Sequence, residues 1–211
     1  MGKQDSTTES IILDAARRVF VAKGFEGARM QEIANEAGIN KALLHYYFRS
    51  KDKLFEAVFV DAFVQFVPGL LITLNNPLPL FEKIQYFVSH YIDALSTNPF
   101  IPGFILHELG NNPGRVAKII RSSGLNPMQF IEQVEFERKA GTIRNIDGRQ
   151  LIVNMLALCI FPFVGKPILK AVMFSGNEEE FNRFLSTRKK EAADFIINAI
   201  KIDQNEKGNE V

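Results

Sequence analysis

Two short helical patterns separated by one glycine constrain the fold of this 211-residue chain more than any other feature. Apolar residues recur at helical spacing in "MQEIANEAG", residues 30 to 38, and again in "NKALLHYYF", residues 40 to 48. Gly38 lacks a Cβ and therefore tolerates the left-handed turn that ends a helix, while Asn40 is a favourable cap for the next one. The pattern predicts a helix-turn-helix, in which the second helix can enter the major groove of DNA.

The rest of the chain continues the helical texture. Ser6 and Glu9 have the spacing of a capping box, so we expect a first helix of about four turns that ends at Gly24. A fourth helix follows "RSKDK" and ends at Pro68, and a wide apolar stripe from Ile84 to Leu95 predicts a helix after the linker "NNPLP". Further helices are predicted over residues 100 to 110, 113 to 139, 147 to 163 and 178 to 201. No strand-like alternation bounded by turns occurs, so the predicted fold is all-α.

The patterns divide the chain into two domains and a tail. We expect a three-helix helix-turn-helix domain at the N-terminus and a C-terminal helical bundle with its own apolar core. The fourth helix, residues 52 to 67, belongs to both cores. The predicted boundaries are 1–50 for the first domain, 51–203 for the second and 204–211 for a polar tail.

Charge is informative only locally. The formal net charge of +1 gives no global attraction to nucleic acid. Residues 37 to 53, however, carry four basic side chains against the single acid Asp52, a local charge of 4 − 1 = +3. Aromatic hydroxyls and an imidazole lie beside them, and such groups donate to phosphate oxygens. The alternative interpretation is a solvated charged turn.

Other function classes find little support. The histidines are far apart, and no H-E-x-x-H, C-x-x-C or glycine-rich phosphate loop occurs, so we predict neither an enzyme nor a metal site, and no cofactor. Cys159, the one cysteine, lies among apolar residues and is interpreted as an inert core thiol. Without an apolar leader or a run of about 18 apolar residues, the chain is expected to be soluble and cytoplasmic.

Residues 9 to 58 resemble the DNA-binding region of the TetR family of bacterial transcriptional regulators. The resemblance rests on "AARRVFVAKGFEGARMQEIANEAGINKALLHYYFRSKDKLFEAV", which keeps the family order of a first-helix "A...F...G", then "IA..AG", then a recognition helix ending in "YF", then "SK..L". Further along, "AGTIR" resembles the turn before the family's eighth helix. The resemblance implies a regulator, expected to be a repressor, that binds a palindromic operator as a homodimer.

Carried over position by position, the resemblance implies a set of DNA-contacting residues. It places Asn40 at the cap of the recognition helix, Lys41 and Ala42 at its groove-facing start, and further contacts near phosphates. Two departures matter, because His45 replaces a common tyrosine and Ala28 and Arg29 replace capping hydroxyls, although Arg29 can still reach a phosphate. Tyr47 could equally pack on the apolar side, and Leu43 could read a thymine methyl or pack. The predicted DNA-binding residues are Arg29, Asn40, Lys41, Ala42, His45, Tyr46, Tyr47 and Lys51.

The resemblance also implies an apolar pocket and a dimer face in the second domain. The chain has 19 Phe and no Trp, and most of the phenylalanines must be core. Small-molecule sites combine apolar walls with a few polar groups. The predicted ligand-binding residues are Phe59, Phe63, Phe66, His90, Tyr91, Phe104, His107 and Glu108. An apolar ligand would tilt the shared fourth helix and release DNA.

The patterns over residues 147 to 163 and 178 to 201 are apolar on more than one face, which leaves surface to bury. Family members pair through their last two helices, so we predict a homodimer through this region. The alternative function is a helical carrier or sensor of a hydrophobic molecule without DNA binding, which would leave the basic segment unexplained.

Overall fold

The computed structural model describes residues 2–62, 76–98, 101–111, 113–122, 124 and 126–202. Within these ranges the secondary structure is helical, and an isolated antiparallel bridge joins Ile143 to Lys201. The all-α prediction is confirmed. The predicted end of the fourth helix and the predicted tail lie outside the described residues.

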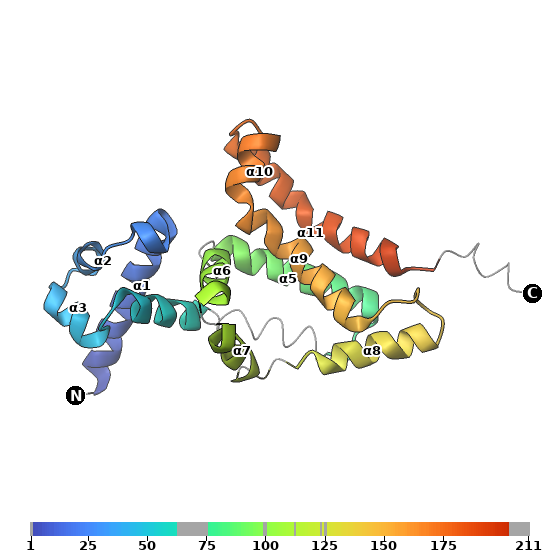
Figure 1. Cartoon of the computed structure of the whole chain (residues 1–211), viewed down its shortest axis with the longest axis horizontal. Helices are drawn as coiled ribbons and strands as arrows, with labels where there is room; N and C mark the ends of the chain where they lie inside the picture. Colours follow the sequence, from blue (N-terminus) through green and yellow to red (C-terminus); the bar gives the residue numbers. More distant parts are fainter. Residues whose placement is uncertain are drawn as a thin grey trace, which may run out of the picture. The chain divides into compact units, whose positions relative to one another are not determined.

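The chain forms two compact units (Figure 1). Unit 1 comprises Met1–Phe66 and Asn98–Ser123, and unit 2 comprises Val67–Thr97 and Gly124–Val211. The domain limits expected from the sequence, 1–50 and 51–203, stay a prediction. The helix over 51–62 falls in unit 1.

Unit 1 contains the helix-turn-helix. Its helices are α1 (Gly2–Gly27), α2 (Met30–Glu36), α3 (Lys41–Tyr47), the helix over 51–62, α6 (Ile101–Asn111) and α7 (Pro113–Ser122). α1 packs on α2, α2 on α3, and α6 on α7. The predicted start of α1 was wrong, because the helix already begins at Gly2. Gly24 does interrupt it, with φ 68° and ψ 176°, and one further turn follows.

The core of unit 1 follows the apolar periodicity. Phe20 of α1, Ile33 of α2, Leu44 of α3 and Phe59 of the 51–62 helix are all buried. The ring of Phe55 contacts the ring of Phe20 edge-on at a centroid distance of 4.7 Å. Aromatic pairs of this geometry stabilise a core beyond the area that they bury. The short helices are therefore held mainly by tertiary packing.

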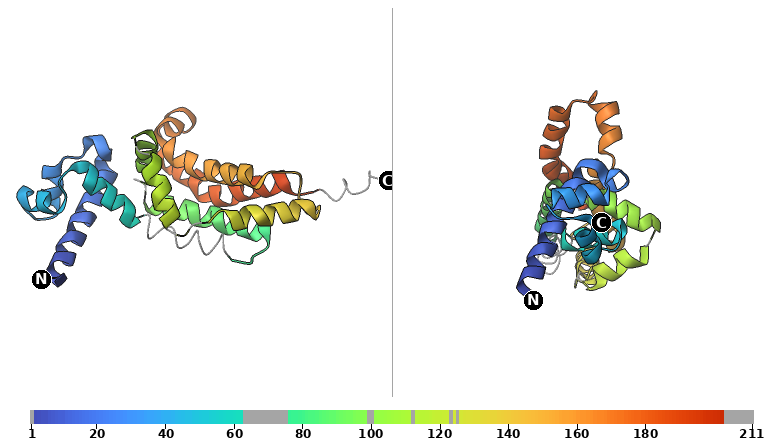
Figure 2. Two further views of the ribbon diagram at one scale, coloured as in Figure 1. Left: turned by 60° about the horizontal axis from the view of Figure 1, so that its bottom comes forward. Right: turned by 90° about the vertical axis from the view of Figure 1, so that its left-hand side faces the viewer.

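Unit 2 contains longer helices, namely α5 (Leu80–Thr97), α8 (Met128–Lys139), α9 (Gly148–Val164), α10 (Lys166–Met173) and α11 (Glu178–Ile200). α5, α9 and α11 lie side by side, as Figure 1 and Figure 2 show, and α8 and α10 pack against α9. The predicted stripe from Ile84 to Leu95 is buried in this bundle. The single helix predicted over 113 to 139 was wrong. Gly124 adopts φ 79° and Pro127 caps α8, so the chain breaks there into α7 and α8.

A proline inside α9 leaves a carbonyl that another helix uses. Pro162 has no N–H and cannot bond to the carbonyl of Leu158, four residues earlier. The guanidinium of Arg188 in α11 donates to that carbonyl oxygen instead, with an Nη2···O distance of 3.1 Å. The helix continues through the proline to Val164, and the freed acceptor joins α9 to α11.

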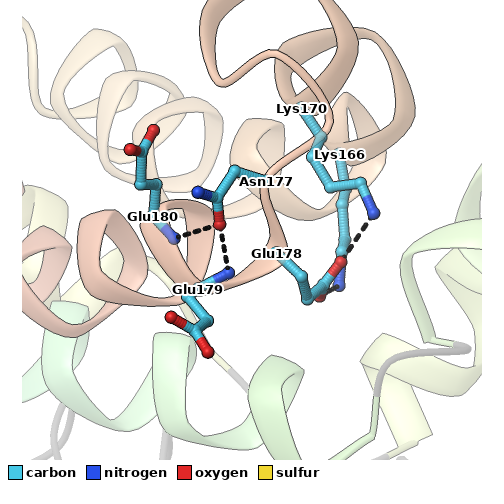
Figure 3. Close-up of polar contacts among 6 residues, drawn as sticks. All are labelled: Lys166, Lys170, Asn177, Glu178, Glu179 and Glu180. Atoms are coloured by element: carbon cyan, nitrogen blue, oxygen red, sulfur yellow. Dashed lines mark hydrogen bonds and ion pairs between the residues drawn. The ribbon is translucent and has the colours of Figure 1, made fainter.

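Helix α10, which contains Pro167, was not predicted, because it lies between the helices expected over 147 to 163 and 178 to 201. Proline is in fact favoured in the first turn of a helix, where its missing N–H has no partner to lose. Both Lys166 and Lys170 of α10 donate to the carboxylate of Glu178 at 2.7 Å (Figure 3). The side-chain oxygen of Asn177 caps α11 by accepting the N–H groups of Glu179 and Glu180 (Figure 3). These contacts fasten α10 to the first turn of α11.

No single helix in the described part of the chain has the length and apolarity required to cross a membrane. α9 and α10 meet that requirement only as a pair, and they are bent by 71° at the break between them.

Candidate nucleic-acid interface

The turn between α2 and α3 is built from the residues that the sequence indicated. Gly38 adopts φ 67°, and the N–H of Ile39 donates to the carbonyl of Ala34 at 3.0 Å. The side-chain oxygen of Asn40 accepts the N–H of Leu43 at 2.7 Å. Leu44 is fully buried against the rest of unit 1. These contacts seat the inner face of α3 and leave its opposite face in solvent.

The outer face of α3 carries donors and small groups. The side chains of Lys41, Ala42 and His45 are exposed, and Tyr46 is 78% exposed. Tyr47 is half-buried, with its ring edge-on to Tyr46 at 5.4 Å. This surface offers an ammonium, an imidazole and a phenol from one short helix, which suits contacts with phosphates and base edges.

Arg29 lies at the start of α2. It is the N-cap, exposed and extended, and its side chain makes no capping bond. Two ion pairs also join α2 to α1, from Arg18 to Glu36 at 2.7 Å and from Lys23 to Glu32 at 2.9 Å. The hydrogen bond from Lys23 is the main cause that lowers the pKa of Glu32. The Arg29 guanidinium stands in solvent beside the positive end of a helix.

Lys51 differs from the other predicted contacts. It is half-buried, and its ammonium donates to the carbonyl of Phe25 at 2.8 Å and to that of Ala28 at 3.3 Å. The same ammonium lies 4.3 Å from the centre of the Phe25 ring. Phe25 is a residue that sequence reasoning missed, because its partner lies 26 positions away.

The predicted ligand-binding residues are only partly described. Phe59 is buried in unit 1, Tyr91 is buried in unit 2, and His90 is exposed on α5 with Nδ1 3.0 Å from the carbonyl oxygen of Tyr86. Burial raises the pKa of Tyr91 well above its ordinary value. The side chain of His90 is therefore in solvent, whereas that of Tyr91 is in the core of unit 2. Phe63, Phe66 and the side chains of Phe104, His107 and Glu108 lie outside the described residues.

The last helices of unit 2, α9 to α11, expose several large apolar side chains, and we call their exposed sides together the α9–α11 face. Its large exposed side chains are Val153, Phe161, Ile168, Val172, Met173 and Phe195. A groove of about 280 Å³ opens between α9 and α11, and its lining includes Ala157, Leu158 and Phe195. A large exposed apolar surface generally marks an interaction site. Sequence analysis identified the excess apolar character here but not its extension onto α10.

Metal-binding chemistry finds no support in the described residues, which hold no group of three or more His, Cys, Asp or Glu side chains arranged for an ion. The thiol of Cys159 is buried, as predicted, and burial raises its pKa to about 12. A thiol with this pKa stays protonated and unreactive near neutral pH.

A capped recognition helix with an exposed basic and aromatic face, followed by a separate helical unit, defines a helix-turn-helix DNA-binding protein. Residues 12–58 match the family described as bacterial regulatory proteins, tetR family. Residues 12–58 are thus a TetR-family DNA-binding domain, and the resemblance that the sequence showed to this family of transcriptional regulators is confirmed. Proteins of this family regulate transcription and are not enzymes, in agreement with the sequence analysis.

Individual relatives show how far the similarity extends. The HTH-type transcriptional repressor NicS of Pseudomonas putida is 33% identical over 92 residues, which is 42% of this chain and 43% of NicS. The chain thus matches less than half of that relative. The crystal structure of HlyIIR, a hemolysin II transcriptional regulator, shares 23% identity and covers 94% of this chain and 99% of its own, with a TM-score of 0.62.

A structure of AibR in complex with isovaleryl coenzyme A and operator DNA is also similar, at 23% identity and a TM-score of 0.62. It covers 74% of this chain and 85% of its own. At these identities the two structures show a shared fold, and the fold extends well beyond the N-terminal match.

Proposed function

We propose that this protein is a homodimeric transcriptional repressor that binds a palindromic operator through α3 and releases it when an apolar small molecule binds. The observation that carries the proposal is the outer face of α3, where Lys41, His45 and Tyr46 are exposed on a helix capped by Asn40. The name of NicS, a repressor, supports the direction of regulation.

The outer face of α3 and the residues beside it support two kinds of DNA contact, with base edges and with phosphates. Lys41 and Ala42 stand at the N-terminal end of the helix, the end that contacts base edges in helix-turn-helix proteins. Arg29, His45, Tyr46 and Tyr47 flank it and would bind phosphates. Asn40 caps the helix through Oδ1, and its amide N–H groups would donate to a phosphate. Phosphate contacts set the register and base contacts set the sequence.

The α9–α11 face supports the homodimer. One α3 reads too few base pairs for useful specificity, so two copies related by a two-fold axis are needed, with recognition helices about 34 Å apart. A two-fold axis brings the same patch of both copies together. In such a pairing the exposed ring of Phe195 in one copy can fill the groove between α9 and α11 of the other.

The interior of the second domain supports the ligand. Its helices are rich in apolar side chains, and Tyr91 contributes a buried hydroxyl. The structure of AibR was determined with isovaleryl coenzyme A and operator DNA, so a similar fold accommodates both kinds of partner. We propose Tyr91 as a polar contact of the ligand in this interior, and the other ligand-binding residues expected from the sequence stay a prediction.

Selection from random duplexes tests DNA binding. The purified chain should enrich an inverted repeat with half-sites one helical turn, or a multiple of it, apart. The variant Lys41→Glu, which reverses one charge on the exposed face of α3, is the matched control and should enrich nothing. A parent protein that enriches no sequence at 50 mM salt contradicts the proposal.

Transcription in vitro tests the direction and the ligand. A promoter that carries the selected site should yield less transcript when the protein is added, and a compound found by thermal-shift screening should restore it. The compound and the operator must weaken each other's binding by the same factor. More transcript on adding the protein would identify an activator, and equal compound affinity with and without operator would remove the ligand from the mechanism.

A further inference from the structure

The side chain of Lys51 joins the two ends of the helix-turn-helix. α2 and α3 together span residues 30 to 47, Ala28 precedes them and Lys51 follows them. The hydrogen bond from the Lys51 ammonium to the Ala28 carbonyl, at 3.3 Å, therefore connects the residue after the motif to the residues before it. The second bond, to the Phe25 carbonyl at 2.8 Å, ties the same point to the last turn of α1.

The surroundings favour a cation at this place. The last carbonyls of a helix have no partner within the helix, and that end carries partial negative charge. The final turn of α1, after the interruption at Gly24, presents such carbonyls to Lys51. The Phe25 ring, 4.3 Å from the ammonium, adds a cation–π contact.

The contacts of Lys51 with Phe25 and Ala28, which we call the clamp, lie against the core of unit 1. The ring of Phe25 lies 4.7 Å from the ring of Phe55, which belongs to the 51–62 helix. Phe55 also contacts Phe20 of α1. An ammonium has three N–H donors, and two of them serve backbone carbonyls here. The half-buried side chain is thus fixed between α1 and the 51–62 helix before any DNA is bound.

We propose that Lys51 is a positioning residue, which sets the orientation of α3 for the operator through its two hydrogen bonds to the carbonyls of Phe25 and Ala28. This inference rests on the proposed DNA binding through α3. Non-specific binding depends mainly on the number of phosphates neutralised, whereas operator binding also needs the recognition helix aligned in the groove. Loss of the clamp should therefore lower operator affinity far more than affinity for unrelated DNA.

The experiment compares Lys51→Met with Lys41→Met in the full chain, on the selected operator and on a scrambled duplex, across a salt series. Lys51→Met should reduce the ratio of operator to scrambled affinity at least tenfold, whatever the change in its salt slope. Lys41→Met, at an exposed phosphate or base contact, should reduce the slope by about 0.9. In the free proteins, amide hydrogen exchange over residues 41 to 47 should accelerate in Lys51→Met and not in Lys41→Met.

A second variant separates the effect of the Phe25 ring from the effect of the Lys51 charge. Phe25→Leu keeps the charge of Lys51 but removes the ring beneath it, so the affinity ratio should fall, by less than in Lys51→Met, with the slope unchanged. An unchanged ratio in Phe25→Leu, or an unchanged ratio in Lys51→Met whatever its salt slope, would overturn the inference. Failure of the parent to bind any duplex would end the proposed function instead, and the exchange comparison would still test the clamp.

Discussion

The exposed face of α3 and the α9–α11 face differ in the side chains that they present to solvent. The helices that carry these faces also have a buried side, since Leu44 on α3 is fully buried and Leu151 on α9 is almost fully buried. Their outer sides differ, since α3 exposes Lys41 and Tyr46 whereas α11 exposes Phe195. The inner face decides how a helix folds into its unit, and the outer face decides which partner it can bind.

The largest expected effect concerns the inner face. Phe181 of α11 is fully buried, with its ring edge-on to that of Phe174 and tilted against that of Phe184, so Phe181→Ala should lower the free energy of unfolding by about 3–5 kcal/mol. Phe136→Ala, at a ring that is 71% exposed on α8, should change it by less than about 0.5 kcal/mol. Urea denaturation measures both, and equal losses would contradict the division into inner and outer faces.

The next effect concerns the outer face of unit 2. Phe195→Asp places a charge where we propose that two copies meet, and a buried unpaired charge is costly. Light scattering should report twice the 23.8 kDa chain mass for the parent and a single chain mass for this variant. Phe136→Asp, at an equally exposed ring outside the face, should stay dimeric. A parent that is monomeric at micromolar concentration and still binds operator would refute the dimer.

A smaller effect concerns the start of α3. Asn40→Ala removes the acceptor of the Leu43 N–H and should destabilise the protein by about 1 kcal/mol. Asn40→Asp keeps the acceptor and should preserve stability, while its negative charge should weaken DNA binding. Thermal unfolding and operator binding, measured on the same samples, separate the two roles. Loss of stability in both variants would mean that the cap needs the amide itself.

The smallest effect is the pH dependence at α10. Hydrogen bonds from Lys166 first, and then from Lys170, hold the pKa of the Glu178 carboxyl at about 2, below its ordinary value of 4.5. A lowered folded-state pKa stabilises the protein above pH 4.5, and this contribution disappears as the pH falls through about 2. Glu178→Gln should therefore melt slightly below the parent at pH 7 and together with it near pH 2. Glu179→Gln, which leaves these lysine contacts intact, is the control.

The predictions from sequence succeeded where neighbouring residues decide the structure. Asn40 caps α3 and Gly38 turns the chain because both effects act within four residues. The stripe of α5 is buried as its periodicity indicated. The same local rules missed α10, since a proline such as Pro167 can open a helix as well as end one. They also missed the break near Gly124.

The sequence by itself determined the helix-turn-helix, its capping and its family, because these depend on short-range spacing. Only the tertiary structure decided where long polar side chains end. The Lys51 ammonium lies on carbonyls 23 and 26 positions earlier, and the Arg188 guanidinium lies on a carbonyl 30 positions earlier. A flexible cation has many partners open to it in an unfolded chain, and the packing of the helices selects one by bringing particular backbone carbonyls within its reach.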